Sequence, residues 1–147
     1  NILTLTRYLK YPREWLESVN AQTMTIEELL RRSHVITIHV PLKKDTYHMI
    51  SNREFSLMRD GAYLINTSRG GVVDENALLE ALKSGKLAGA ALDVYEIEPP
   101  TNLELIKMPN VICTPHIGAQ TVEAQRAASM QIAKRIITEF LAEKSSP

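Results

Sequence analysis

Apolar positions along the chain fall into two patterns, and these patterns predict the order of strands and helices. Short runs rich in Ile, Val and Leu predict strands, and they lie at 2–6, 35–40, 62–66, 88–94 and 111–114. Between these runs, helices are predicted at 13–18, 25–32, 51–58 and 74–85. A last helix is predicted from about Thr121, because its apolar residues recur at three- and four-residue spacing, as expected for a helix packed on one face: Ala133, Ile136, Ile137, Phe140 and Leu141.

Polar residues at the helix ends support these boundaries. Thr25–Glu28 and Ser51–Glu54 have the spacing of a capping box, in which each side chain accepts a hydrogen bond from the other residue's backbone. Asp74 is a good N-cap for the following helix, and Gly85 suits its C-terminal end. Pro12 can open the short helix before residue 18, because the first turn needs no proline N–H.

Short, almost continuously apolar strands separated by capped helices predict an α/β fold with parallel strands covered on both faces. Right-handed crossovers then bring the carboxyl ends of all strands to one edge of the sheet, where ligands bind in such folds. Polar or ionisable groups follow each predicted strand: Thr6 and Arg7, residues 39–41, residues 67–71, Asp93, and residues 114–118. The sequence therefore predicts a binding site at this edge.

Composition narrows the class of partner. The 147 residues fit one domain, and Lys plus Arg equals Asp plus Glu at 17 each. Because there is no basic excess and no long apolar run, we predict neither a nucleic-acid nor a membrane partner. Cys113 is the only cysteine, which fits a reducing compartment and a cytoplasmic location. The chain starts at Asn1 with no leader and is expected to be part of a longer protein, with a small processed protein as the alternative.

Three separated segments resemble a known family. They are HVPL (39–42), INTSRGGVVDENALLEALKSGKLAGAALDVYEIEPP (65–100) and NVICTPHIG (110–118). Together they resemble the D-isomer-specific 2-hydroxyacid dehydrogenases, most of all the glyoxylate/hydroxypyruvate reductase and phosphoglycerate dehydrogenase groups. The resemblance covers about residues 2–141. It implies NAD(P)-dependent conversion between a 2-keto acid and a D-2-hydroxy acid, in a homodimer.

The same resemblance implies a Rossmann-like, doubly wound parallel sheet. Residues 1–143 would form a partial dinucleotide-binding domain, residues 144–147 a tail, and the substrate domain would lie outside this chain. The glycine fingerprint GxGxxG, whose backbone approaches the pyrophosphate, is absent from the sequence. We therefore expect the sheet to be incomplete at its N-terminal end, without the first strand and the glycine-rich loop.

The resemblance also assigns the reacting groups to Arg69, Glu98 and His116. An imidazolium at His116 can donate a proton to the carbonyl oxygen and take it back in the reverse direction. Glu98 beside it would favour the charged ring. Arg69 offers a planar fork of donors for the substrate carboxylate and carbonyl oxygen. In isolation, each of these side chains has an ordinary structural or surface role as its alternative.

Further residues are assigned to the cofactor. Asp93 would accept a hydrogen bond from the nicotinamide carboxamide, and four residues would line the cofactor: Pro41, Thr67, Ser68 and Gly118. NAD-preferring relatives carry an acid at the end of the second strand, where this chain has Thr6 followed by Arg7. We therefore predict NAD or NADP, with NADP slightly favoured; ordinary exposed basic residues are the alternative explanation.

The same sequence bears on three other functional assignments. No Cys, His and carboxylate spacing suggests a metal site, and His34, His39 and His48 are expected to be structural or surface residues. A non-catalytic alternative is a nucleotide-sensing interaction module like the C-terminal-binding corepressors. Those proteins retain similar residues, so the sequence leaves this alternative open. Formate dehydrogenases carry Gln where Glu98 stands, which argues against that group.

Overall fold

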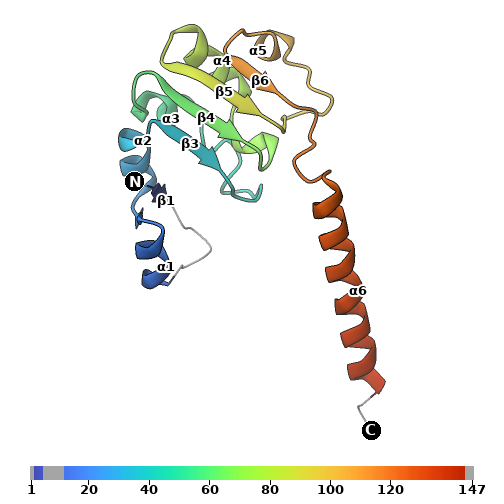
Figure 1. Ribbon diagram of the computed structural model, residues 1–147. Helices are drawn as coiled ribbons and strands as arrows, with labels where there is room; N and C mark the ends of the chain where they lie inside the picture. Colours follow the sequence, from blue (N-terminus) through green and yellow to red (C-terminus); the bar gives the residue numbers. More distant parts are fainter. Residues whose placement is uncertain (1, 5–11, 145–147) are drawn as a thin grey trace. The chain divides into compact units, whose positions relative to one another are not determined.

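The computed structural model describes residues 2–4 and 12–144, and the chain separates into two compact units, 1–115 and 116–147, each described by itself. In the first unit (Figure 1) the strands are β1 (Ile2–Thr4), β2 (Ala21–Thr23), β3 (Val35–Ile38), β4 (Ala62–Asn66), β5 (Leu87–Leu92) and β6 (Val111–Cys113). Its helices are α1 (Arg13–Ser18), α2 (Ile26–Arg32), α3 (Asn52–Leu57), α4 (Glu75–Lys83) and α5 (Leu103–Ile106), with a short 3-10 turn at Gly70–Val72. The second unit contains α6 (Val122–Lys144).

The central feature of the first unit is a four-stranded parallel sheet in the order β3-β4-β5-β6. At its carboxyl edge the last residues of the strands are paired in one row, from Ile38 through Asn66 and Leu92 to Cys113. The loops that follow all four strands therefore start side by side. This confirms the parallel α/β fold and the shared edge predicted from the sequence. Strands β1 and β2 form a separate parallel pair.

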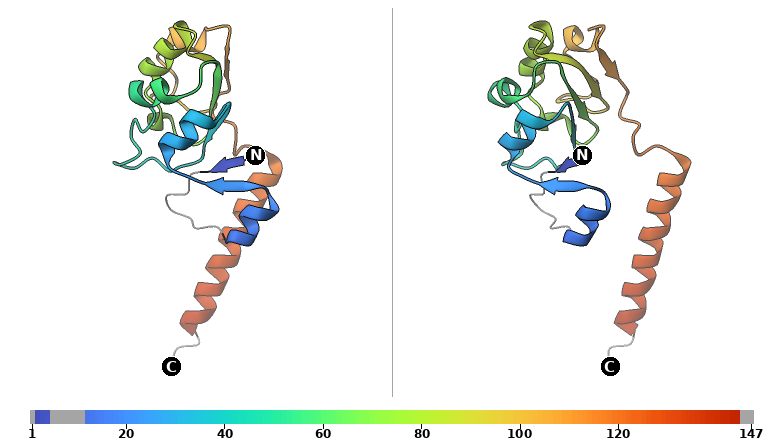
Figure 2. Two further views of the ribbon diagram at one scale, coloured as in Figure 1. Left: turned by 90° about the vertical axis from the view of Figure 1, so that its left-hand side faces the viewer. Right: turned by 60° about the vertical axis from the view of Figure 1, so that its left-hand side comes forward.

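Four helices pack on one face of this sheet (Figure 2), and their apolar side chains build the core together with the buried residues of β3, β4 and β5. Leu30 from α2, Phe55 from α3, Leu78 from α4 and Leu105 from α5 are almost fully buried. The opposite face of the sheet is different. Its alternate positions are exposed, by 55% at Val35, 49% at Tyr63 and 70% at Ile112.

The sequence predicts helices on both faces of the sheet; within the described part of the first unit, the helices lie on one face. The strands have the alternating burial of a sheet with one covered face, such as buried Ile36 and Ile38 beside exposed Val35 in β3. Their exposed positions are also apolar, so the sequence resembles that of a fully covered strand.

The caps form as their spacing predicted. The Thr25 hydroxyl accepts from the Glu28 N–H, and the Glu28 carboxylate accepts from the Thr25 N–H. Asp74 Oδ1 accepts hydrogen bonds from the Asn76 and Ala77 N–H groups in the first turn of α4, at 3.1 Å each. Gly85 follows α4 with a φ of +75°, a conformation that favours glycine. Strand β2, helix α5 and the 3-10 turn were not predicted, because three or four residues are too few to show a period. The equally short β1 and β6 were recognised by their apolar runs, which β2 (Ala-Gln-Thr) lacks.

Helix α6 confirms the predicted last helix and spans 23 residues. Its start is capped by Thr121, whose hydroxyl accepts from the Ala124 N–H at 3.1 Å. Within its own unit the predicted apolar face is not packed, since Ile136, Ile137 and Phe140 are each more than half exposed. The physical reason is that this unit contains no second described element against which the face could pack. No helix in the described parts of the chain is long and apolar enough to cross a membrane.

Candidate functional site

The turn after β4 is built on a buried amide that sequence reasoning missed. Asn66, the last residue of β4, is only 1% exposed. Its Oδ1 accepts from the Ser68 N–H at 3.1 Å and from the Ser68 hydroxyl at 2.9 Å, and its Nδ2 donates to the Arg69 carbonyl at 3.0 Å. A single buried side chain therefore fixes the turn through residues 67–69. An asparagine that ends an apolar strand is the signal that could have revealed it.

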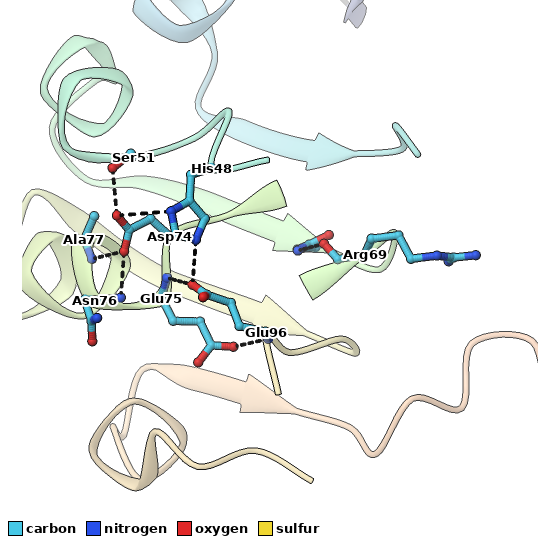
Figure 3. A network of polar contacts seen from close by, with 9 residues as sticks. His48, Ser51, Arg69, Asp74, Glu75, Asn76, Ala77 and Glu96 are labelled. Carbon is cyan, nitrogen blue, oxygen red and sulfur yellow. Dashed lines mark hydrogen bonds and ion pairs between the residues drawn. The ribbon is translucent and has the colours of Figure 1, made fainter. Parts of the chain in front are cut away.

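Arg69 has extended backbone angles and lies at the exposed end of this turn. One guanidinium nitrogen, Nη1, donates to the Ser68 carbonyl at 2.6 Å. In Figure 3 the side chain extends away from the polar network around α4. An anchored guanidinium can present a planar pair of donors to a carboxylate.

The residue after Arg69 brings two predicted site segments into contact. A Cβ atom on Gly70 would lie 1.8 Å from the Tyr95 carbonyl oxygen, a distance at which atoms overlap. Only glycine lets the backbone after Arg69 approach the loop after β5 this closely. That loop carries Glu98, so the structure holds the segments of Arg69 and Glu98 against each other.

Asp93 and Thr114 connect the ends of β5 and β6. Asp93 is 5% exposed, and its Oδ1 accepts from the Thr114 hydroxyl at 2.5 Å. Its backbone N–H donates to the Asn66 carbonyl at 3.0 Å. The nearby Tyr95 hydroxyl lies 2.9 Å from the Thr114 carbonyl, and burial raises the pKa of Tyr95, so this hydroxyl remains a donor. The predicted site residue Asp93 is thus held rigidly at the carboxyl edge.

The other predicted residues of the first unit lie on the loops that follow the strands. Glu98 is exposed, with its Oε1 accepting from the Tyr95 N–H at 3.2 Å, and a cis peptide bond joins it to Pro99. Pro41 and Thr67 are exposed and Ser68 is half-buried. These residues come from three loops that start in the same row of strand ends.

His116 and Gly118 belong to the second unit, where both are exposed. His116 has a φ of +54°, a left-handed conformation that is uncommon outside glycine and concentrated at functional sites. Its carbonyl accepts from the Gln120 side chain at 3.2 Å. Thr6 and Arg7 lie outside the described residues. Among the residues that the structure describes, no group of three or more His, Cys, Asp or Glu side chains could hold a metal ion.

Comparison with known proteins identifies the family. Residues 1–118 match the model of the D-isomer specific 2-hydroxyacid dehydrogenase, NAD binding domain. The chain is 52% identical over 121 residues to a glyoxylate reductase of Thermococcus litoralis, covering 82% of this chain and 37% of that protein. It is 46% identical over 137 residues to a D-3-phosphoglycerate dehydrogenase of Methanocaldococcus jannaschii, covering 92% and 26%.

A solved structure supports the same family assignment. The D-lactate dehydrogenase of Aquifex aeolicus, complexed with NAD and lactic acid, superposes with a TM-score of 0.81 at 37% identity, over 95% of this chain and 47% of that chain. This chain therefore spans less than half the length of each of these relatives. The family resemblance, the nicotinamide-binding fold and the α/β architecture predicted from the sequence are confirmed. The chain belongs to the NAD-binding domain family of the D-isomer-specific 2-hydroxyacid dehydrogenases.

Proposed function

We propose that the protein containing this chain transfers a hydride between a nicotinamide cofactor and a small 2-keto acid or D-2-hydroxy acid of the glyoxylate or hydroxypyruvate kind. The observation that carries the proposal is the contact between Gly70 and Tyr95 at the carboxyl edge. This contact joins the segment that carries the anchored, exposed Arg69 guanidinium to the segment that carries the Glu98 carboxylate. Such an edge is where parallel α/β sheets bind their ligands.

The chemistry of this edge fits a nicotinamide cofactor, which supplies or accepts the hydride when it is bound. The buried Asp93 carboxylate is a suitable acceptor for the carboxamide N–H groups. Pro41, Thr67 and Ser68 lie on neighbouring loops and would line the cofactor, with Gly118 from the second unit. These four assignments rest on the family resemblance.

In the proposed reaction Arg69 binds the substrate carboxylate and the carbonyl oxygen, so that its charge offsets the negative charge that develops on that oxygen. His116 donates the proton that this oxygen requires and accepts it in the reverse direction. Glu98 pairs with the imidazolium and favours its charged form. In this proposal Arg69 binds the substrate, His116 transfers the proton, and Glu98 supports the proton donor.

We further propose that the protein slightly prefers NADP to NAD. This preference rests on Thr6 and Arg7, which replace the acid expected at the end of the second strand in NAD-preferring relatives. Comparing kcat/KM for NADPH and NADH on the same keto acid tests it. A clear advantage of NADH would overturn the preference. A homodimer and a cytoplasmic location are proposed on the family resemblance and the single cysteine.

Glyoxylate- and hydroxypyruvate-dependent oxidation of NADPH and NADH tests the function itself. We expect turnover that depends on both the keto acid and the reduced cofactor, and that is lost in Arg69→Ala. The corepressor-like alternative predicts cofactor binding without turnover. Cofactor binding with no oxidation of either substrate would therefore overturn the enzymatic proposal.

A further inference from the structure

A polar cluster outside the proposed reacting groups joins three segments of the first unit (Figure 3). We call it the His48 cluster; it consists of His48, Asp74, Glu75 and Glu96. His48 lies on the loop between β3 and α3, Asp74 and Glu75 start α4, and Glu96 lies on the loop after β5. Sequence reasoning gave His48 a structural or surface role and gave Glu96 none.

His48 is held firmly in the middle of this cluster. Its backbone has a φ of +48°, and its N–H donates to the Gly71 carbonyl at 2.8 Å. Its ring stacks on Tyr47, with centroids 4.0 Å apart. The Nε2 atom is shielded from solvent and lies 3.2 Å from Glu96 Oε1, while Nδ1 lies 3.9 Å from Asp74 Oδ2. The imidazole therefore lies between carboxylates of two different segments.

Glu96 is connected to α4 in both directions. Its Oε1 accepts from the Glu75 N–H at 2.8 Å, and its own N–H donates to Glu75 Oε1 at 2.7 Å. Glu96 stands between Tyr95, whose carbonyl touches Gly70, and Glu98, whose carboxylate accepts from the Tyr95 N–H. Glu96 therefore connects the start of α4 to the segment that contacts Gly70 and carries Glu98.

The cluster brings several carboxylates close to the imidazole. Burial raises the pKa of Glu75. The hydrogen bond from the Glu96 N–H acts against this rise, and the charge of Glu96 adds to it. Burial also disfavours the charged form of Asp74, but hydrogen bonds from the Ala77 N–H and the Ser51 hydroxyl, and then the charge of His48, lower its pKa overall. Three carboxylates thus converge, and the groups that face His48 are Asp74 from α4, Glu96 from the loop after β5, and Tyr47 from its own loop.

We propose that His48 is a positioning residue: through Glu96 it holds the loop that carries Glu98 against the turn that carries Arg69. The proposal rests on the proposed function insofar as Arg69 binds the substrate and Glu98 supports the proton donor. Without the imidazole, Glu96 loses its contact with His48 Nε2 and Asp74 loses its contact with His48 Nδ1, so the contacts of Glu96 with α4 weaken.

Amide hydrogen exchange on the full chain tests the positioning without any need for activity. His48→Phe keeps a ring for stacking but removes both nitrogens, and His48→Gln keeps a neutral donor. In His48→Phe we expect protection of the Tyr95 and Glu96 amides to fall about tenfold, while the amides of β4 and β5 keep their protection. His34→Gln, at an exposed histidine, is the control. Unchanged protection at both amides overturns the proposal, as does an equal loss across the whole sheet.

Kinetics of the intact protein provide the second test. Small misplacements of reacting groups cost up to ~100-fold in rate. We therefore expect His48→Phe to lower kcat about tenfold, with KM for the keto acid changed less than twofold because Arg69 still binds the carboxylate. Adding Glu96→Ala should cause no further loss, since both changes break the same connection. Additive losses, or a change in KM alone, contradict the proposal.

Hydrogen exchange and kinetics together distinguish failure of the proposed function from failure of the positioning role of His48. If the unaltered protein reduces no keto acid, the proposed function fails, yet the exchange experiment still decides whether His48 positions the loop. If His48→Phe does not fold, His48→Gln is measured in its place, with intermediate losses expected in both tests.

Discussion

Arg69 and Glu98 are two of the three side chains to which the proposed reaction is assigned, and their surroundings differ. Arg69 stands on a turn fixed by the buried Asn66, whereas Glu98 lies on an exposed loop. A guanidinium on a fixed turn can keep its two donors in one plane toward an anion. The geometry of this fork, rather than charge alone, should therefore matter for substrate use.

Arg69→Lys tests the fork. The charge remains but the paired donors are lost, so kcat/KM for the keto acid should fall roughly 100-fold, the scale of losing one donor to a developing oxyanion. Affinity for the cofactor should stay within about twofold, which calorimetry can measure. If steady-state kinetics with the keto acid are unchanged, Arg69 is not at the substrate.

Glu98→Gln tests the proposed support of His116. Reduction needs the charged imidazole, so activity is lost as pH rises and the proton leaves. Without the Glu98 charge the imidazolium loses its partner, and this loss of reductive activity should begin at lower pH. The measurement is the pH dependence of kcat/KM for reduction, and a profile that coincides with that of the unaltered protein contradicts the pairing.

At the scale of elements, α4 depends strongly on one residue. Asp74 caps its first turn, accepts from the Ser51 hydroxyl at 2.9 Å and lies near His48. It therefore links the start of α4 to α3 and to the loop before it.

Asp74→Ala should lower the free energy of unfolding by about 1 kcal/mol at neutral pH through loss of the cap. The folded protein lowers the pKa of Asp74. The stabilisation by its charged form is therefore present above the unfolded pKa of about 3.9 and is lost as pH falls through the folded value. Asp74→Asn keeps an acceptor, so it should cost less at neutral pH and lack this acid-dependent loss. Urea unfolding followed by circular dichroism across pH 2–7 measures the stability of both variants. Identical acid profiles for Asp74→Asn and the unaltered protein would contradict the role given to the charged Asp74 carboxylate.

Elements were predictable from the sequence where their signal is local. The box at Thr25, the cap at Asp74 and the glycine at Gly85 each involve a few consecutive residues, and all form as predicted. By contrast, the contact of Gly70 with Tyr95 and the pairing of His48 with Glu96 depend on strand register and join segments far apart in the chain. No local pattern encodes such pairs, so a single sequence could not reveal them.

On the scale of the whole molecule, the carboxyl edge was predictable because parallel topology brings every strand end to one side. The uncovered sheet face was not, because exposed Val35, Tyr63 and Ile112 are as apolar as buried residues. Hydrophobicity predicts that a residue favours burial, but it does not identify the element that buries it.

The absence of a GxGxxG fingerprint from these 147 residues leads to a prediction about the chain by itself. Without a glycine-rich cradle for the pyrophosphate, we expect the isolated chain to bind NADPH or NADH only weakly and to turn over little or no substrate. Isothermal titration measures this directly. Binding at micromolar or tighter dissociation constants would show that the described loops suffice for the cofactor.

The outer edge of β3 has a consequence for handling the protein. Within the described residues, β4 is the only strand paired with Val35–Ile38, so backbone N–H and C=O groups on the far side of β3 have no strand to bond. Such a row is a template for another extended chain. We therefore expect concentrated solutions of the isolated chain to self-associate through this strand, and we expect Val35→Lys, at an exposed position, to reduce this association.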